Sequence, residues 1–453
     1  MGFFVLDVLM IKIVKKPFFV LKPDKFGKYV VNFESLQMLR NPFVRATLGA
    51  LVAVAWSGQA CAVDLMADYQ KAKNYDPTFQ TAIAERQANQ ASATQARVAY
   101  LPQGTLSNQR LQTDTTTRQT ITITQPIIDL QNFATLRMAE PRQGFAEATF
   151  LVKQQDLAMR LLKASNAIIL ANENLKLNAS KMAALDQQAL AAKRKLELGQ
   201  GTVTDLRDIE VKAAQAKSQQ LTFKTALDVA AKQYAAITGE RPKVAEFALD
   251  SKDRTLKLLP VNDYVDQALQ NNPNLMATRF SERVAELEVQ RSTGALLPTF
   301  SATHSNSKAG GVSNSYSGVL LNMPLQVGSF YARLGVEANY LKAKETTRDV
   351  EEKTRVEVEK LREQIETGLE ALQIQKEAIA AAELSLEANK KSYEGGVRSA
   401  VDILNATQTV FQVKSDFVTS LTTQAESILS LLHQVSPESG DTLVVADKFL
   451  FAR

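Results

Sequence analysis

The residue types that most often carry catalysis or bind metal ions are scarce in this chain of 453 residues. It has one cysteine, Cys61, and two histidines, His304 and His433. Those numbers argue against a disulfide framework, a Cys/His zinc site and a thiol enzyme. Neither histidine stands in a motif with a nucleophile or a second ligand, so both are expected to be isolated surface residues. The sequence therefore predicts no catalytic residue, no metal site and no cofactor.

The charged residues that could do chemistry follow two glycine turns. Gly199 lies six residues before Asp205, and Gly396 lies six residues before Asp402. An acid at this distance from a turn is well placed to cap the N-terminus of a helix. Capping of the two helices is therefore one explanation of both acids, and it can coexist with a further role.

These two turns belong to two copies of one unit. Leu101-Pro102 and Leu297-Pro298 are 196 residues apart, and the two glycine turns are 197 residues apart. An ordered series of matches at a nearly constant offset indicates an internal repeat. The sequence predicts a first repeat over residues 63–250 and a second over residues 251–453.

Each copy begins with a helical composition and continues with a pattern that is typical of strands. Residues 120–124 alternate polar and apolar side chains, as a strand with two different faces does, and residues 299–303 are a weaker version. Two strands are expected in each copy, within about residues 102–128 and 298–327.

A seam of apolar or small residues follows the strands in both copies. Its steps alternate between three and four residues, which is typical of a coiled coil. Leu161 belongs to the first seam, and Val358 takes the same place in the second, 197 residues later. Each seam helix is expected to run for roughly 60 residues, or about 90 Å. It should turn back at the glycine segment into a further long helix.

Residues 1–62 have the features of an N-terminal extension and a signal peptide. Two arginines follow Met38, a short apolar run comes next, and Ala60-Cys61-Ala62 places small residues before a cleavage site. We expect translation to start at Met38 and signal peptidase to cut after Ala62. The alternative is an uncleaved anchor helix.

Removal of this segment changes the charge of the chain. Residues 1–62 hold eight of the 53 basic residues and three of the 48 acidic ones, which leaves 45 of each. A mature chain without net charge does not suggest nucleic acid as a partner. No later stretch reaches 18 apolar residues, so no transmembrane helix is expected, and insertion into a membrane would need a closed barrel.

The predicted elements are incomplete in a single chain. Four short strands cannot close a barrel, because about eight are needed. Three copies would supply twelve strands and would give exposed helix seams a partner. The residues alone therefore predict an α+β chain, four strands per chain, that assembles into an oligomeric barrel on a long helical tube, and they do not fix the number of copies.

The duplicated helix–strand–strand–helix–helix unit, the Leu-Pro dipeptides and the Gly-x5-Asp turns together resemble the TolC family. The resemblance covers residue 63 to about residue 450. It implies a homotrimeric channel in the outer membrane, surrounded there by lipid, with its helical domain in the periplasm. The implied fold class is α+β: a trimeric 12-stranded transmembrane β-barrel, four strands per chain, continued by a long periplasmic α-helical coiled-coil barrel. It also implies a passive exit duct for type I protein secretion or tripartite efflux. The implied partners are a periplasmic adaptor protein and an inner-membrane ABC or RND pump.

The resemblance also assigns roles to the second helical turn. Asp402 would line the constriction of the channel. The family often has a second acid one helical turn further on, where this chain has Asn405, so a weaker negative ring is expected. Tyr393 and Arg398 would latch the closed state.

The resemblance assigns roles to the first turn as well. Thr204 and Asp205 would be the partners of that latch. The glycines of both turns would mark where the adaptor docks; they are Gly199, Gly201, Gly395 and Gly396.

Two other classes of protein compete with a channel. A periplasmic coiled-coil adaptor would have no pore of its own, but it should carry a lipoyl-like β-domain between two helices, and none is visible. An exported enzyme would need a site, and no nucleophile with a base is apparent. The cargo is not recorded in the sequence, since the pump would select it.

The signal-peptide hypothesis makes a direct prediction. Mass spectrometry of the mature protein from the cell envelope should find Val63 as its first residue, because signal peptidase cuts after the small residues of Ala60-Cys61-Ala62. Peptides from residues 1–62 in the mature protein would contradict it.

Overall fold

The structure is a computed structural model of the chain. It describes residues 64–110, 116–249, 254, 256–324, 327–395, 397–437 and 439–451, all within one unit, residues 62–453. The predicted signal peptide and Gly396 lie outside the described residues, as does the loop between the first two strands.

The first repeat opens with two helices rather than one. Helix α3 spans Leu65–Tyr75, and α4 spans Pro77–Arg97. The break falls at Asp76 because a proline suits the first position of a helix but not its interior. The Asp76 carboxylate caps α4 by accepting a hydrogen bond of 2.8 Å from the backbone N–H of Phe79.

The second repeat is built in the same way. Helix α8 spans Val261–Asn271, and α9 spans Pro273–Gly294. The side chain of Asn272 caps α9, since it accepts a hydrogen bond of 3.0 Å from the backbone N–H of Leu275. The same Asx-Pro pair therefore produces the same helix break in both repeats.

The four predicted strands form one antiparallel sheet. They are β1 (Gln103–Arg110), β2 (Thr117–Ile128), β3 (Thr299–Ala309) and β4 (Val312–Asn322), in the order β1-β2-β3-β4. The two central strands come from different repeats, so the sheet joins the two hairpins. A glycine pair with positive φ, Gly310 and Gly311, makes the turn of the second hairpin.

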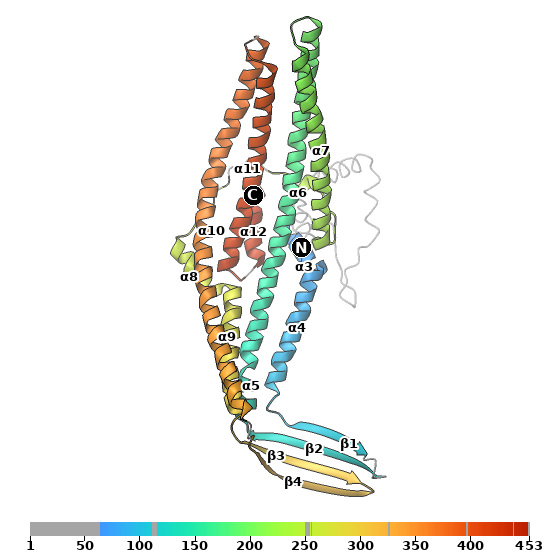
Figure 1. Cartoon of the computed structure of the whole chain (residues 1–453), viewed down its shortest axis with the longest axis vertical. Coiled ribbons are helices and arrows are strands. Elements are labelled where there is room, and N and C mark those ends of the chain that lie inside the picture. Colours follow the sequence, from blue (N-terminus) through green and yellow to red (C-terminus); the bar gives the residue numbers. More distant parts are fainter. Residues whose placement is uncertain are drawn as a thin grey trace, which may run out of the picture. The chain divides into compact units, whose positions relative to one another are not determined.

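The predicted seams lie on two long helices. In the first repeat a short helix, α5 (Leu130–Arg137), leads into α6 (Ala139–Glu197). In the second repeat α10 runs over Gly328–Glu394. Figure 1 shows that both extend from the sheet to the opposite end of the unit, where they turn back.

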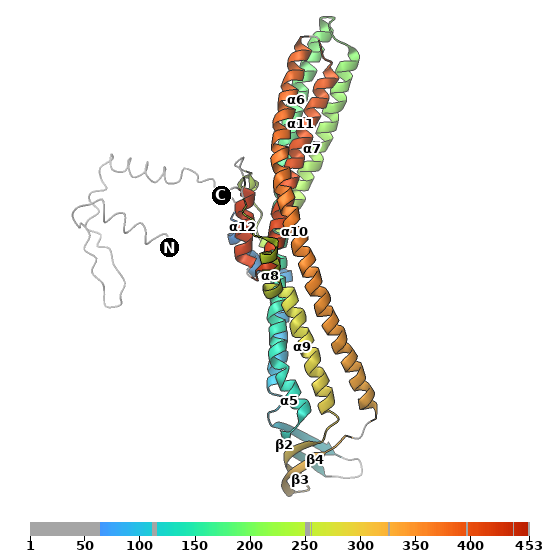
Figure 2. The ribbon, with the colours of Figure 1, turned by 90° about the vertical axis from the view of Figure 1, so that its left-hand side faces the viewer.

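The returning helices complete two long hairpins. Helix α7 (Val203–Thr238) packs along α6, and α11 (Ala400–Val435) packs along α10. In Figure 2, α9 lies beside the lower part of α10 and fills the place that α11 takes higher up. Each long helix thus has a helical partner along most of its length.

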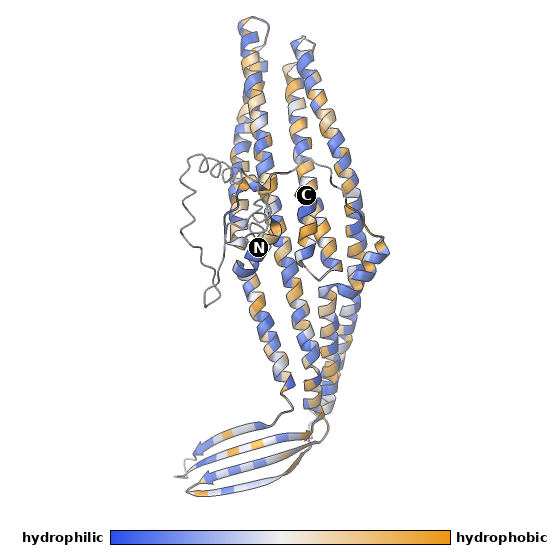
Figure 3. Cartoon of the chain, turned by 180° about the vertical axis from the view of Figure 1, so that it is seen from behind, coloured by the Kyte–Doolittle hydropathy of each residue, from blue (hydrophilic) through white to orange (hydrophobic). Residues whose placement is uncertain are grey.

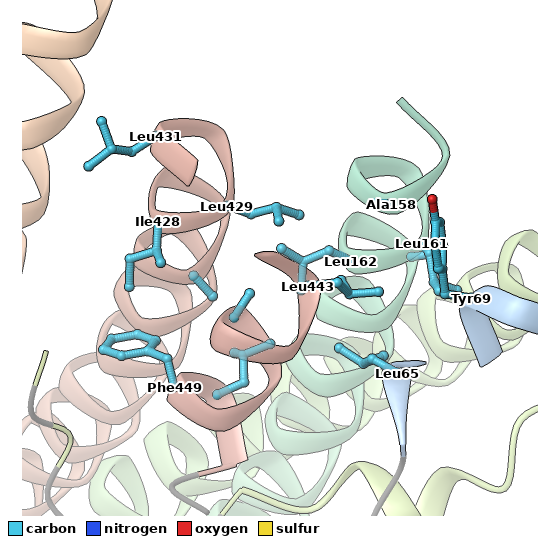
Figure 4. Packing of buried hydrophobic residues seen from close by; sticks show 14 of the residues in the cluster. Leu65, Tyr69, Ala158, Leu161, Leu162, Ile428, Leu429, Leu431, Leu443 and Phe449 are labelled. Carbon is cyan, nitrogen blue, oxygen red and sulfur yellow. The ribbon is translucent and has the colours of Figure 1, made fainter. Parts of the chain in front are cut away.

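The main core lies where the short helices meet the two hairpins. It gathers Leu65 and Tyr69 of α3, Leu161 of α6 and Leu429 of α11, all fully buried. Figure 4 shows how these side chains converge. The seam residues Leu161 and Val358 are both part of this core, as the heptad pattern predicted.

A C-terminal helix that the sequence analysis did not foresee closes this core. Helix α12 spans Ser439–Phe451 and inserts Leu443 and Phe449 among the residues of α3 and α11. The linker between the repeats also holds a short 3-10 helix, η2 (Val244–Phe247). Arg254 of that linker donates to the carbonyls of Phe449 and Leu450 at 3.1 and 3.0 Å, which satisfies the end of α12.

In the described part of the chain, no helix carries an apolar stretch long enough to cross a membrane.

The expectation of two surface histidines was half wrong. His304 is exposed on β3, and its Nδ1 lies 2.8 Å from the Ser317 hydroxyl. His433, in contrast, is only 8% exposed near the end of α11, and its Nε2 is buried without a partner. Burial lowers the pKa of His433 to about 4. His433 stands in an apolar segment at the end of α11, between Leu431 and Val435, which are also buried.

The buried histidine predicts a pH dependence of stability. Below pH 6.5, the usual pKa of histidine, His433 binds a proton in the unfolded chain. In the folded chain it stays neutral down to about pH 4. The free energy of unfolding should therefore fall by about 2 kcal/mol between pH 7 and pH 5. The substitution His433→Gln should remove most of that loss in thermal unfolding measurements. His304→Gln is the matched control and should leave it unchanged.

Candidate gate at the helical turns

The first hairpin reverses through a tight glycine turn between α6 and α7. Gly199 adopts a φ of 69°, a conformation that residues with a side chain rarely take. The backbone N–H of Gln200 donates back to the carbonyl of Lys195 at 2.8 Å. A Cβ on Gly201 would lie 3.1 Å from the backbone nitrogen of Leu196. Gly199 is therefore favoured by its backbone conformation, and Gly201 by the close passage of the backbone.

Helix α7 starts with a capped N-terminus. Thr202 is the N-cap, and its hydroxyl accepts a hydrogen bond of 3.0 Å from the backbone N–H of Asp205. Thr204 is exposed beside it, and Asp205 is half-buried. The two predicted latch residues of this turn thus lie together at the tip of the first hairpin.

The second hairpin reverses between Gly395, the C-cap of α10, and Ser399, the N-cap of α11. Gly395 has a φ of −77°, so this residue does not use the conformational freedom of glycine as Gly199 does. The predicted partner Gly396 is outside the described residues.

Asp402 forms a capping box with Ser399. The Asp402 carboxylate accepts from the backbone N–H and from the hydroxyl of Ser399, both at 3.0 Å, and the Ser399 hydroxyl lies 3.3 Å from the Asp402 N–H. The Arg398 guanidinium is 3.7 Å from the same carboxylate. The Ser399 N–H, then its hydroxyl, and then the Arg398 charge lower the pKa of Asp402. The carboxylate is therefore held in its charged form, and Asn405 is exposed one helical turn further on.

Tyr393 contacts Lys195, whereas the sequence suggested Thr204 and Asp205 as its partners. The Lys195 ammonium lies 3.6 Å from the centre of the Tyr393 ring and 3.4 Å from the Tyr393 carbonyl oxygen. Within the described part of one chain, neither Tyr393 nor Arg398 makes a hydrogen bond or ion pair with Thr204 or Asp205. The predicted latch residues therefore all lie at the two tips, but within the described part of one chain the residues of the second tip do not bond to those of the first.

A small apolar cluster supports both turns. It contains Leu185, Ile209 and Leu404 together with alanines such as Ala192 and Ala400. Lys195 was missed in the sequence, although Lys181, Gln188 and Lys195 repeat every seven residues beside the seam. This seven-residue spacing is a signal from which Lys195 could have been identified in the sequence.

The described residues offer no competing site. No group of three or more His, Cys, Asp or Glu side chains among them could hold a metal ion. The site that the sequence and the fold share is the pair of helical turns at the tips of the hairpins.

Comparison with known proteins identifies the class to which this fold and these turns belong. The sequence profile of the family described as outer membrane efflux protein matches residues 69–240 and 264–433. The chain belongs to this family of outer-membrane channel proteins. The two matched segments account for both repeats of the chain, which does not favour a coiled-coil adaptor.

Individual relatives agree with this assignment. The chain is 25% identical over 390 residues to the alkaline protease secretion protein AprF of Pseudomonas aeruginosa, covering 79% of this chain and 81% of that protein. It is 26% identical over 440 residues to the outer membrane protein TolC of Vibrio cholerae, covering 90% of this chain and 98% of that one. The crystal structure of the outer membrane protein VceC from Vibrio cholerae has the same fold, with a TM-score of 0.70 and 15% identity over 83% of this chain and 97% of that one.

Proposed function

We propose that three copies of this chain form a gated duct through which a secretion or efflux system exports its cargo across the outer membrane. The observation that carries the proposal is the four-stranded sheet. In the described chain the outer strands, β1 and β4, do not pair with each other. Each therefore has one edge that is free to pair with a strand of another copy. Open edges are a liability that closure with further copies removes. Three sheets of four strands would give a barrel of twelve.

One face of the sheet is suited to line a water-filled pore. Residues that pair across strands share a face, and one face carries Thr120 and Thr122 of β2 opposite Ser307 and Ser305 of β3. Their hydroxyls lie 3.3 and 3.2 Å apart, respectively. Such a polar, mostly uncharged face suits the interior of a barrel.

The other face carries an apolar belt that suits lipid. Figure 3 shows hydrophobic and hydrophilic residues alternating along the strands. The apolar residues of this face are Leu106 on β1, Ile121 and Ile123 on β2, Phe300 and Ala302 on β3, and Val319 and Leu321 on β4.

The belt crosses the strands obliquely. Ile123 pairs with His304 rather than with Ala302, and the belt on β1 and β2 is displaced by about four residues from that on β3 and β4. Four residues correspond to about 13 Å along a strand, and two strand spacings to about 10 Å. The resulting slope of roughly 50° is near the tilt of strands in membrane barrels.

The helical tips are suited to receive a partner protein. Three apolar residues at the two turns are largely exposed: Leu198 by 72%, Val203 by 59% and Val397 by 82%. Apolar side chains on the tips of otherwise polar turns favour a protein contact. We assign this contact to a periplasmic adaptor that links the duct to an inner-membrane pump. The glycines of both turns, Gly199, Gly201, Gly395 and Gly396, would shape the docking surface.

The gate is assigned to the same tips. Asp402 from each subunit would form a ring of three carboxylates, with Asn405 beside it. Arg398 and Tyr393 would latch the second hairpin to Thr204 and Asp205, through contacts that a neighbouring subunit completes. A duct with this gate needs no catalytic residue, and we propose no enzymatic activity. The test is single-channel recording in planar bilayers of the chain that starts at Val63.

Substitutions in the ring should change ion selectivity in opposite directions. Asp402→Asn keeps an acceptor for the Ser399 N–H but removes the charge, so the preference for cations should fall severalfold. Asn405→Asp adds a second acid and should raise both cation preference and block by divalent cations. Reversal potentials in a salt gradient measure both effects. Equal selectivity of the three proteins would argue that the constriction lies elsewhere.

Loss of the arginine of the latch should open the duct. Arg398→Ser removes a charged hydrogen-bond donor from the closed state, and such a bond is worth about 1.5–3 kcal/mol when it is shielded from water. We expect at least a twofold rise in single-channel conductance. Arg207→Ser is the control, because Arg207 is exposed on α7 and pairs only with Glu210. A rise of the same size in that control would contradict a specific latch.

A further inference from the structure

Two lysines of α6 contact the second hairpin in the same way at two levels. The Lys195 ammonium lies over the Tyr393 ring and against the Tyr393 carbonyl oxygen. The Lys181 ammonium lies 5.0 Å from the centre of the Phe411 ring and hydrogen-bonds to the side-chain oxygen of Gln408. Each contact therefore combines an aromatic face with an oxygen acceptor. The lysines are 14 residues apart, or two heptads, so they share one face of α6.

The contact of Lys195 joins the ends of two long helices. Lys195 lies in the last turn of α6, and its acceptor, the Tyr393 carbonyl, lies in the last turn of α10. The carbonyl end of a helix carries partial negative charge, and a cation there is stabilising. One ammonium group serves two such ends, because both helices run toward the tips (Figure 1).

The contact of Lys181 is deeper in the protein. The side chain is buried between α6 and α11, and burial, with a smaller contribution from the charge of Lys212, lowers its pKa. A buried ammonium is costly unless its donors are satisfied, so Gln408 and Phe411 must stay in place when the hairpins are packed.

Between the two contacts the hairpins meet in the small apolar cluster around Leu185 and Leu404. An open groove of about 250 Å³ lies beside this cluster, and its walls include Ala400 as well as Lys195 and Tyr393. The amide nitrogen of Gln188, one heptad after Lys181, is buried there without a partner. The contact of Lys195 therefore adds to a small apolar cluster at a level where the packing is incomplete.

We propose that Lys195 and Lys181 form a clamp that holds the second hairpin against the first. The contact of Lys195, at the gate, breaks when the duct opens, whereas that of Lys181, nearer the core, is kept. This inference rests on the proposed function, since a clamp matters only if the tips move. It differs from the latch at Arg398, because both partners belong to one chain and the lysine, not the arginine, supplies the charge.

Further contacts between the hairpins indicate where the moving part of the second hairpin ends. The Asn166 amide donates to the Thr422 carbonyl at 3.1 Å, and the Ser415 hydroxyl donates to Asn174 at 2.7 Å. These contacts lie on the core side of Lys181. When Lys195 releases Tyr393, the segment that is free to swing therefore ends at the level of Lys181.

The test uses single-channel conductance of folded, bilayer-inserted trimers. Lys195→Met keeps the length of the side chain but loses the charge, and should raise conductance at least twofold. Lys195→Arg keeps the charge over the ring and should conduct as the unchanged protein does. Lys193→Met is the matched control, since Lys193 is exposed two residues away on α6. If Lys195→Met does not form trimers, Lys195→Gln removes the same charge with a polar side chain.

The sizes of the conductance changes distinguish the role of Lys195 from that of Lys181. Lys181→Met alone should change conductance little, because Lys195 still holds the tip, whereas the double variant should exceed Lys195→Met. Conductance of Lys195→Met equal to that of Lys193→Met would overturn the clamp. So would a larger effect of Lys181→Met than of Lys195→Met.

Failure of the proposed duct would look different. In that case the unchanged trimers and the Asp402→Asn trimers would both carry no current, and Lys195 variants would carry none either. Current through the unchanged trimers, with no response to Lys195, refutes the clamp alone.

Discussion

The apolar seams of α6 and α10 are the constraint on which the remaining structure depends. Each helix is about 60 residues or more in length, 59 in α6 and 67 in α10, and neither can leave such a stripe in water. The seams are covered by the helices that return along them and, nearer the sheet, by the short helices of each repeat. Two results follow from this covering. The reversals fall at one end of the unit, and the strands that lead into the seams fall at the other. The seams therefore set the helical turns, where we propose the gate, and the sheet, which we propose to lie in the membrane, at opposite ends.

Polar residues beside the seams decide how the helices align. An apolar stripe alone would allow the helices to slide by a heptad at little cost. Asn178, fully buried in α6, donates to the Ala216 carbonyl of α7 at 2.9 Å and so fixes the register within the first hairpin. Asn166 and Asn174 do the same between α6 and α11. Nearer the tips, Lys181 and Lys195 make the polar contacts between the two hairpins.

Much of this arrangement was predictable because it is written in local periodicity. The heptads gave the long helices, the alternation of Thr120 to Thr124 gave a strand, and the duplication gave its partners in the second repeat. The break at Asp76 was not foreseen, although an Asx-Pro pair is a local signal for one. Helix α12 depends on contacts between distant segments, whereas the apolar residues around His433 were a local signal of burial that the sequence analysis did not use. The helical turns were found because glycine and acidic residues mark them, whereas the contacts of Tyr393 required the geometry of two helix ends.

Divergence between the two repeats separates the cations of the proposed clamp from its aromatic rings. The positions that correspond to Lys181 and Lys195, 197 residues later, are Ala378 and Ser392. Those that correspond to Phe411 and Tyr393 in the first repeat are Ala214 and Leu196. The first hairpin therefore has the cations without the rings, and the second has the rings without the cations. If the hairpins move apart as proposed, the charged contact that must break at the tips is therefore the one that Lys195 makes with Tyr393.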